Sequence, residues 1–385
     1  MWQYLYMKLY MNRSHQLDFF RGLFLILILV DHYLTWDNLV MKFTSEFIGW
    51  VSAAEAFVFL SGLTAGLVYT YKLADKGEAY IKKAATKRAL DIYKYHTILF
   101  LLTLLILFSH KPIRLFWMST FSDIVHEPML ATLKGFLLLY QPLYLDILPM
   151  YAVFLLFVPL AIRSFRNGNH LLLLSISFLL YLIGTFELVS PLMGPNFFQV
   201  RVNLGYFNLL SWQFLFVIGI FIGFLAYYKK VERLKQNIPL LTVALIITIT
   251  LFLLKLLDVS FLNFNLGFWT EKGHLRPLRL LNFAAIFTIV TFVSFRFRSW
   301  FKYKPINYLG KHSLEVFSFH ILLIILFKPF GAYLNSLWKI KLSETTYIYP
   351  YSTLLLLVLI PALYVAPIIM KKRSYGPIKL KRPVS

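Results

Sequence analysis

The first long apolar segment of the chain carries an arginine and a histidine at a spacing that places both on one face of a helix. Arg21 lies near the start of residues 18–36, and His32 follows eleven positions later. At about 100° per residue, the two side chains lie about 20° apart around the helix axis and about 16 Å apart along it. Hydrocarbon disfavours ionisable groups, so this pair indicates a polar site. We expect the other helices to build a tunnel around this face.

The residue types suggest acid–base chemistry on a hydroxyl. A neutral imidazole can take a proton and return it, so His32 is a candidate general base. Arg21 is a candidate for binding an anion or stabilising developing negative charge. Asp31 lies about 100° round the helix from His32 and would orient it only by way of another helix. Glu55, at the start of the second apolar segment, either positions the imidazole as a catalytic partner or forms a structural ion pair with an arginine.

Other polar residues within or beside the apolar segments are candidate substrate contacts, with a structural hydrogen bond as the alternative for each. They are Asp18, Ser61, Asp146, Asn208, Trp212, Gln213, His312, Ser313 and His320. Ser313 has no base placed beside it, so we do not expect it to be a nucleophile. A basic segment is suited to binding the phosphates of a nucleotide, unless it only marks topology and attracts anionic lipid. It contains Lys82, Lys83, Lys87 and Arg88.

The composition is that of a membrane protein. Of the 385 residues, 59% are hydrophobic and 15% are charged, whereas a soluble domain carries about 25% charged residues. The chain has no cysteine, which excludes disulfides, thiolate metal sites and a cysteine nucleophile. A net charge of +22 is explained better by basic cytoplasmic loops than by nucleic-acid binding.

Windows of about 20 apolar residues predict an all-α fold in which ten helices span the membrane as a single domain over residues 1–385. The predicted ranges are 18–36, 50–71, 92–109, 147–163, 170–189, 208–228, 238–257, 278–296, 312–328 and 352–370. Residues 129–140 are apolar but too short to cross, which predicts an interfacial or re-entrant helix. Lysine and arginine concentrate in alternate connecting segments, which puts both termini in the cytoplasm. Gly62 and Gly66 are spaced for close helix packing.

This layout places the longer loops on the outer side of the membrane. They are residues 110–146, 190–207, 258–277 and 329–351. Their rings and polar groups suit a sugar, because aromatic rings stack on the apolar faces of sugars. An interfacial aromatic belt is the alternative. The side chains concerned are Trp117, Trp269, Trp338, His126, Glu127, Asp146, Glu271 and His274.

Several segments, spread over most of the chain and in matching order, resemble the OpgC branch of the acyltransferase-3 superfamily. These membrane enzymes O-acylate glycans of the cell envelope. Arg21 and His32, with ten residues between them, match the arginine–histidine signature of that superfamily's first helix. The matching segments are Leu17–Gly22, Asp31–His32, Ala53–Gly62, Leu145–Tyr151, Phe207–Gln213 and Gly310–Phe317.

The resemblance implies a multi-pass enzyme of the bacterial inner membrane with a ten-helix core. It would move an acyl group, often succinyl, from cytoplasmic acyl-CoA, such as succinyl-CoA or acetyl-CoA, to a hydroxyl of a periplasmic glucan or other envelope glycan. A thioester is already activated, so we expect no metal. The alternative is a proton-coupled transporter or flippase of a glycan or lipid, since intramembrane His, Asp and Glu would serve it equally well. The inverted repeats that a transporter predicts are not obvious in the sequence.

Overall fold

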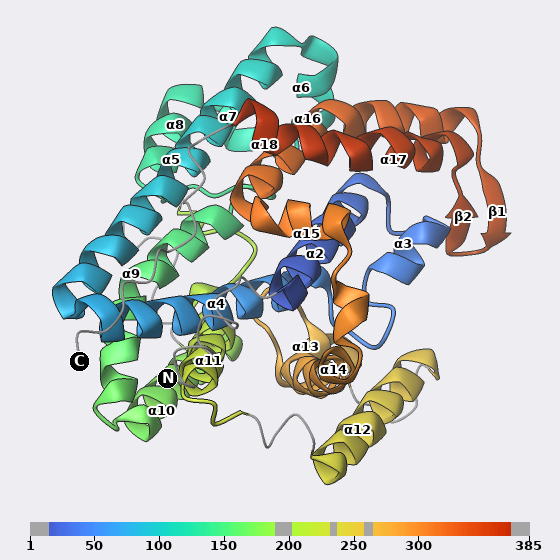
Figure 1. Ribbon diagram of the computed structural model, residues 1–385. Helices are drawn as coiled ribbons and strands as arrows, with labels where there is room; N and C mark the ends of the chain where they lie inside the picture. The colour runs from blue at the N-terminus through green and yellow to red at the C-terminus, as the bar shows by residue number, and fades with distance from the viewer. Residues whose placement is uncertain (1–14, 189–201, 232–236, 258–264, 371–385) are drawn as a thin grey trace.

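The computed structural model describes residues 15–188, 202–231, 237–257 and 265–370. The predicted outer loops 190–207 and 258–277 lie partly outside these described residues. Within them the fold is all-α, as predicted, with one added two-stranded antiparallel hairpin. Figure 1 shows the helices coloured in chain order, with α2 and α4 in the middle of the bundle and α16 along its upper side beside α17.

Each of the ten apolar ranges predicted from the sequence overlaps a helix. The helices are α2 (His15–Tyr33), α4 (Ala53–Lys76), α5 (Glu78–Ser109), α9 (Ile147–Arg166), α10 (His170–Thr185), α11 (Leu209–Tyr227), α12 (Ile238–Leu256), α14 (Pro277–Arg296), α16 (Ser313–Leu337) and α17 (Pro350–Ala362), the last continued by η4 (Leu363–Val365) and α18 (Ala366–Ile369). In the described part of the chain, eight of these segments are long and apolar enough to cross a membrane. The other two are α10, with 16 residues, and α2, which carries Asp18, Arg21 and Asp31.

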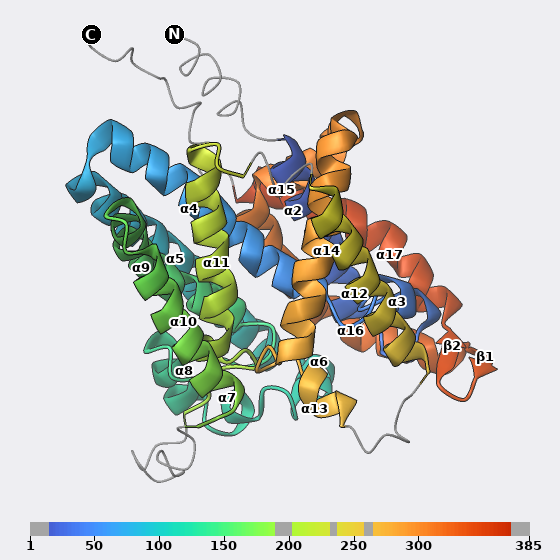
Figure 2. The ribbon, with the colours of Figure 1, turned by 90° about the horizontal axis from the view of Figure 1, so that it is seen from below.

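Shorter elements lie mainly at the two ends of the bundle. They are α3 (Leu39–Thr44), α6 (Lys111–Trp117), α7 (Ser122–His126), α8 (Pro128–Phe136), α13 (Leu266–Thr270), η3 (Arg298–Phe301), α15 (Lys304–Lys311), β1 (Ile340–Ser343) and β2 (Thr346–Ile348). In Figure 2, one end holds α15, the start of α2 and the α4–α5 turn, and we call it the basic face. The opposite end, with α6, α7, α8, α13 and the β1–β2 hairpin, is the hairpin face. The apolar segment 129–140 forms most of α8, among these short helices.

Side-chain caps fix where several of the helices begin. At the start of α4, Ser52 and Glu55 form a capping box, in which each side chain accepts a hydrogen bond from the other end of the first turn. Asn208 caps α11 by accepting from the backbone N–H groups of Leu210 and Ser211, at 3.0 and 3.2 Å. These caps place Glu55 and Asn208 at helix starts, where their side-chain oxygens accept hydrogen bonds from backbone N–H groups.

Helices α4 and α11 pack with backbone against backbone. A Cβ atom added at Gly62 or Gly66 would overlap the carbonyl oxygen of Phe216 or Ile220. From the other side, a Cβ at Gly223 would overlap the carbonyl oxygen of Leu63. The close packing predicted from the spacing of the two α4 glycines is therefore confirmed, and α11 supplies the matching glycine.

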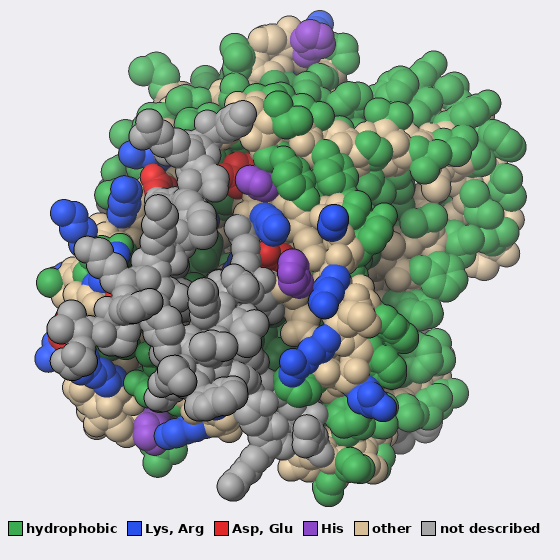
Figure 3. Space-filling model, in the orientation of Figure 1, with side chains coloured by type: hydrophobic (Ala, Val, Ile, Leu, Met, Phe, Trp, Pro, Cys, Tyr) green, Lys and Arg blue, Asp and Glu red, His purple; other side chains and the backbone are tan. Residues whose placement is uncertain are grey.

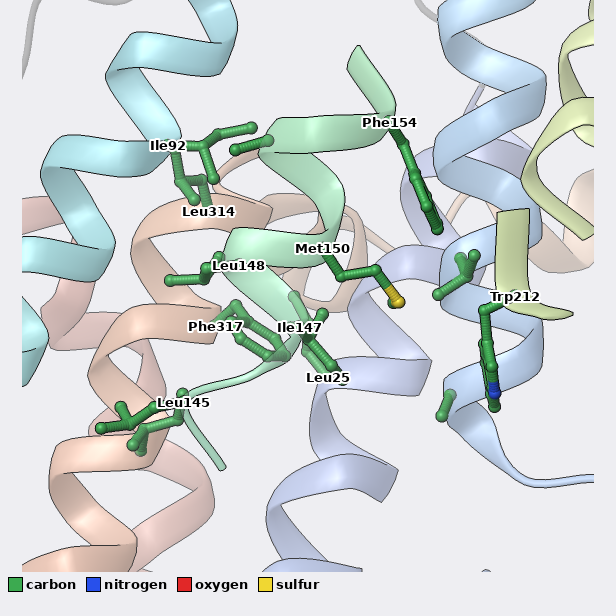
Figure 4. Close-up of a cluster of buried hydrophobic side chains, with 14 of the residues drawn as sticks. Leu25, Ile92, Leu145, Ile147, Leu148, Met150, Phe154, Trp212, Leu314 and Phe317 are labelled. Carbon is green, nitrogen blue, oxygen red and sulfur yellow. The ribbon is translucent and has the colours of Figure 1, made fainter. Parts of the chain in front are cut away.

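The start of α2 is held in the same way against α15. A Cβ atom at Gly22 would overlap the carbonyl oxygen of Ile306, and one at Gly310 would overlap the carbonyl oxygen of Asp18. The two backbones are thus in direct contact on the basic face. Figure 4 shows apolar side chains from α2, α5, α9, α11 and α16 that fill the bundle beyond this contact, among them Leu25, Ile147, Met150 and Phe317.

Candidate active site

The half-buried imidazole of His32 lies against a second imidazole from another helix. His32 belongs to the last turn of α2, and His320 comes from the second turn of α16. The Nδ1 atom of His32 lies 3.2 Å from Nε2 of His320, and the two rings stack with centroids 5.3 Å apart. The Nδ1 atom of His320 contacts the carbonyl oxygen of Phe317 in its own helix. The structure therefore brings together two histidines that are 288 positions apart in the chain.

Lys328 and Tyr144 complete a polar cluster around His32. The Nζ atom of Lys328 donates to the backbone carbonyl of His32 at 2.6 Å and to the Tyr144 hydroxyl at 3.1 Å. The Tyr144 ring meets the His32 ring edge-on, with centroids 4.8 Å apart. Burial raises the pKa of Tyr144 to about 12, so its hydroxyl keeps its proton and can act as a donor. We call His32, His320, Tyr144 and Lys328 the histidine cluster.

The backbone of Tyr144 is held in an uncommon conformation. Its φ angle is +74°, in the left-handed region that residues other than glycine rarely adopt. Such a conformation costs of order 1–3 kcal/mol and persists where surrounding contacts hold it. Here those contacts include Lys328, His32 and Trp117, whose ring lies 5.8 Å from the Tyr144 ring.

Pro329 explains how Trp117 enters this part of the bundle. Proline has no N–H, so Pro329 inside α16 leaves the carbonyl oxygen of Ile325, four residues earlier, without its usual helical donor. The indole Nε1 of Trp117 donates to that oxygen at 2.9 Å. An aromatic residue of the predicted outer loop is thereby fixed beside the histidine cluster.

Arg21 lies at the other end of α2, toward the basic face. Its side chain is half-buried, and Nη2 donates to the carbonyl oxygen of Leu60 at 3.5 Å. On the same face of α2, between Arg21 and His32, Leu25 and Ile28 are only 1% and 4% exposed. The open tunnel predicted along this face is thus filled by packed apolar side chains, because leucine and isoleucine at these positions find partners in the neighbouring helices.

Two pockets lie between neighbouring helices, and the larger one is partly open to the surroundings. The larger, of about 450 Å³, lies between α5 and α16 and is lined by Tyr95, Thr97 and Ser318, among others. The smaller, of about 10 Å³, lies between α4 and α9 beside Ser61, a predicted substrate contact. Neither lining includes Arg21 or His32.

The predicted phosphate-binding segment lies on the first turns of α5. Lys82, Lys83 and Lys87 are exposed there, and Arg88 is half-buried. Figure 3 looks onto the basic face and shows lysine and arginine side chains gathered on it, with hydrophobic side chains around them. The arrangement fits either an anionic ligand or an anionic lipid surface.

The two carboxylates considered as partners for His32 bond elsewhere. Glu55 is fully buried and pairs with Arg279, with Oε1 2.7 Å from Nη1. Its Oε2 accepts from the backbone N–H of Ser52 at 3.0 Å. Asp31 accepts a hydrogen bond from the Thr44 hydroxyl at 2.8 Å. In the described hydrogen bonds, the imidazole of His32 is oriented by His320 instead.

Three predicted substrate contacts near the head of α11 bond the protein itself. Asn208 is the helix cap described above. The indole Nε1 of Trp212, which is 0% exposed, donates to the Gly273 carbonyl at 2.9 Å. The amide of Gln213 exchanges hydrogen bonds with Ser177, donating to its carbonyl and accepting from its hydroxyl, both at 2.7 Å. These side chains fasten α11 to α10 and to the loop before α14.

The remaining predicted contacts also lie apart from the histidine cluster in their hydrogen bonding. Burial raises the pKa of Asp146 to about 6, although its Oδ2 accepts from the backbone N–H of Tyr206 at 3.0 Å. Asp18 is buried in the first turn of α2. His312 and Ser313 form the junction of α15 and α16, where the His312 ring packs on Tyr308.

The outer-loop residues Glu271 and His274 form part of a charged cluster on the hairpin face. Nδ1 of His274 lies 2.9 Å from Oε2 of Glu271, and Nε2 lies 2.7 Å from Oε1 of Glu187. Burial alone would raise the pKa of Glu271, but hydrogen bonds from His274 and Gly273 outweigh it and lower that pKa. In the ranges that the structure describes, no group of three His, Cys, Asp or Glu side chains is arranged to hold a metal ion.

Sequence reasoning missed Lys328 and Tyr144. A lysine inside the apolar segment of α16 is an ionisable group at membrane depth, and this signal could have marked Lys328. The ninth predicted range ended at that residue, which made it read as a helix flank. Nothing in the sequence distinguishes Tyr144 from the other 23 tyrosines, because its place depends on a left-handed turn.

Comparison with known proteins identifies a family. A family model described as OpgC protein matches residues 13–365, which is most of the chain and includes the histidine cluster. No curated protein and no solved structure matches the chain.

Proposed function

The chain belongs to the OpgC protein family of membrane proteins that modify glucans, and from this premise we propose that it is an acyl-CoA-dependent O-acyltransferase. The donor is a cytoplasmic acyl-CoA, such as succinyl-CoA or acetyl-CoA. The acceptor is a hydroxyl of a periplasmic glucan or related envelope glycan. The observation that carries the proposal is the half-buried imidazole of His32, held among polar side chains near one end of an otherwise apolar bundle.

In the proposed reaction, the Nε2 atom of His32 takes the proton of the acceptor hydroxyl. The acceptor oxygen bonds to the thioester carbonyl carbon, the C–S bond breaks, and His32 returns the proton to the departing thiolate. General-base catalysis of this kind contributes about 10²- to 10⁴-fold to a rate. The Tyr144 hydroxyl and the Lys328 ammonium are donors beside the imidazole for the negative charge that develops on the carbonyl oxygen.

Arg21 serves the donor rather than the reacting atoms in this proposal. It lies about 16 Å along α2 from His32, too far for both side chains to act on one carbonyl. A guanidinium at the basic end suits a phosphate group of CoA, with the basic segment of α5 farther out. The gathering of lysine and arginine on the basic face supports a cytoplasmic position for that face and an inner-membrane location.

The test compares purified protein in lipid vesicles with two histidine variants. Wild type is given succinyl-CoA or acetyl-CoA and glucan oligosaccharides, and the mass increment of an acyl ester is measured. We expect H32Q to lower kcat by about 10²-fold or more. H170A is the matched control, since His170 is an exposed histidine at the start of α10. Uptake of unmodified oligosaccharide without ester would favour the transporter alternative, and full activity of H32Q would refute the role of His32.

A further inference from the structure

We propose that His320 is a positioning residue that sets which ring nitrogen of His32 carries the hydrogen, and so makes Nε2 of His32 the base. The catalytic meaning of this inference rests on the proposed function. The hydrogen arrangement itself follows from three polar groups, and it can be measured without any assay of activity.

The first step concerns His320 and the backbone of its own helix. A carbonyl oxygen only accepts hydrogen bonds, so the contact between His320 Nδ1 and the Phe317 oxygen requires a hydrogen on that Nδ1. His320 is 0% exposed, and its described polar partners are a carbonyl and an imidazole. A buried ring without a carboxylate partner is neutral, and a neutral imidazole carries one N–H. The Nε2 atom of His320 therefore presents a lone pair.

The second step shows how the lone pair on Nε2 of His320 sets the position of the hydrogen on His32. Its Nδ1 atom lies 3.2 Å from Nε2 of His320, which is hydrogen-bonding distance. Because the His320 atom can only accept, Nδ1 of His32 must donate and carries the ring hydrogen. The Nε2 atom of His32 is left with a lone pair. In neutral histidine, the bond made by one nitrogen sets the protonation of the other.

This arrangement does for His32 what a carboxylate does in a serine–histidine–aspartate triad. When Nε2 takes the hydroxyl proton, the ring becomes an imidazolium whose Nδ1–H still donates to His320. A hydrogen bond from a charged donor is shorter and roughly twice as strong as a neutral one. His320 thus favours the charged intermediate, and no proton needs to leave the site, because the thiolate takes it back from Nε2.

The alternative is that the two rings only join α2 to α16. Two substitutions separate these roles. The amide of glutamine lies near the position of the histidine Nε2 atom, so in H320Q its oxygen can still accept from His32. The amide of asparagine lies near the position of Nδ1, so in H320N it can bond the Phe317 carbonyl but does not reach His32. If the two rings only joined α2 to α16, both variants would change the stability of the protein and leave kcat of the folded fraction unchanged.

The experiment measures kcat and KM of H320N and H320Q, with each rate normalised to the folded fraction from a fluorescence melt. We expect H320N to lower kcat by about 10- to 100-fold with little change in KM, and H320Q to recover most of that loss. Equal kcat in H320N and wild type would overturn the inference. So would equal losses in H320N and H320Q.

A second measurement keeps the inference separate from the proposed function. ¹⁵N NMR of histidine-labelled protein reports which nitrogen is protonated, and the His32 signals are assigned by their loss in H32Q. We expect a protonated Nδ1 and an unprotonated Nε2 in wild type, and a mixture of the two forms in H320N. A hydrogen on Nε2 of wild-type His32 would refute the inference. If wild type transfers no acyl group, the proposed function fails, and the NMR result still decides the role of His320.

Discussion

Both carboxylate oxygens of Glu55 are engaged in holding the start of α4. Oε1 pairs with Arg279 of α14, and Arg279 also pairs with Glu46 through Nη2 at 2.8 Å. The Nε atom of Arg279 donates to the Thr270 carbonyl at 2.8 Å, so the guanidinium joins α14 to the chain on both sides. A buried charge network of this kind is costly to break, because removal of one member leaves another charge without its partner.

E55Q tests this residue for a structural role. Because the buried guanidinium of Arg279 would lose the fully buried one of its two carboxylate partners, we expect the free energy of unfolding to fall by about 3–5 kcal/mol. The matched control is E78Q, which breaks the exposed pair of Glu78 with Arg163 and should change stability by less than about 1 kcal/mol. Denaturant unfolding in detergent measures both. If E55Q keeps its stability but loses acyl transfer, the result would instead support Glu55 as a catalytic partner.

At the scale of elements, α16 supplies two groups to the site through one irregular position. Lys328 holds the last turn of α2, and the following Pro329 frees the Ile325 carbonyl that binds Trp117. A cation at the carbonyl end of a helix is favourable, so Lys328 stabilises α2 as well as the histidine cluster. The packing of α6 against α16 therefore depends on a hydrogen bond that a regular helix would not offer.

A double-mutant cycle at Trp117 and Pro329 tests this dependence. W117F leaves the buried Ile325 carbonyl without a donor, and we expect it to cost about 1–3 kcal/mol of unfolding free energy. In the P329A background, a restored N–H at position 329 bonds the same carbonyl, so W117F should cost clearly less. Unfolding free energies of the four proteins give the coupling. Additive effects of the two substitutions would contradict the assigned link.

At the scale of the whole molecule, the two faces of the bundle are built differently. The basic face gathers lysine and arginine, whereas the hairpin face holds the short helices and the β1–β2 hairpin. The histidine cluster lies toward the hairpin face and Arg21 toward the basic face, at the two ends of α2. This separation suits a reaction whose two substrates arrive from opposite compartments.

Single cysteines test the orientation, since the natural chain has none. E344C places a thiol in the hairpin, where the Glu344 side chain is 89% exposed, and D75C places one in the last turns of α4 on the basic face. We expect a membrane-impermeant maleimide to label E344C in intact spheroplasts, and D75C only after permeabilisation. The cysteine-free parent is the control for background labelling. The reverse pattern would place the basic face outside.

How far the sequence predicts this molecule depends on the range of the interactions involved. The lengths of the apolar segments locate the helices, and the spacing of Gly62 and Gly66 predicts the close packing of α4. Both features depend on residues close in the chain. The partner of His32 could not be predicted: the sequence offered Glu55 and Asp31, and only tertiary packing brings His320 of α16 to this imidazole. The position of Tyr144 depends on its own left-handed backbone conformation, and that of Trp117 on a carbonyl left without a helical donor by a distant proline. Neither feature produces a local sequence pattern.

Helix α2 is fastened at both of its ends, and this makes it an unsuitable moving part. Its first turns have their backbone against that of α15, and the His32 carbonyl in its last turn is held by Lys328. In the proposed reaction, an opening that admits the donor to the filled centre would then lie in the surrounding helices, where Ile147, Met150 and Phe317 pack beside α2. In this arrangement α2 is the fixed element of the bundle, and His32 keeps its position while the surrounding helices open and close.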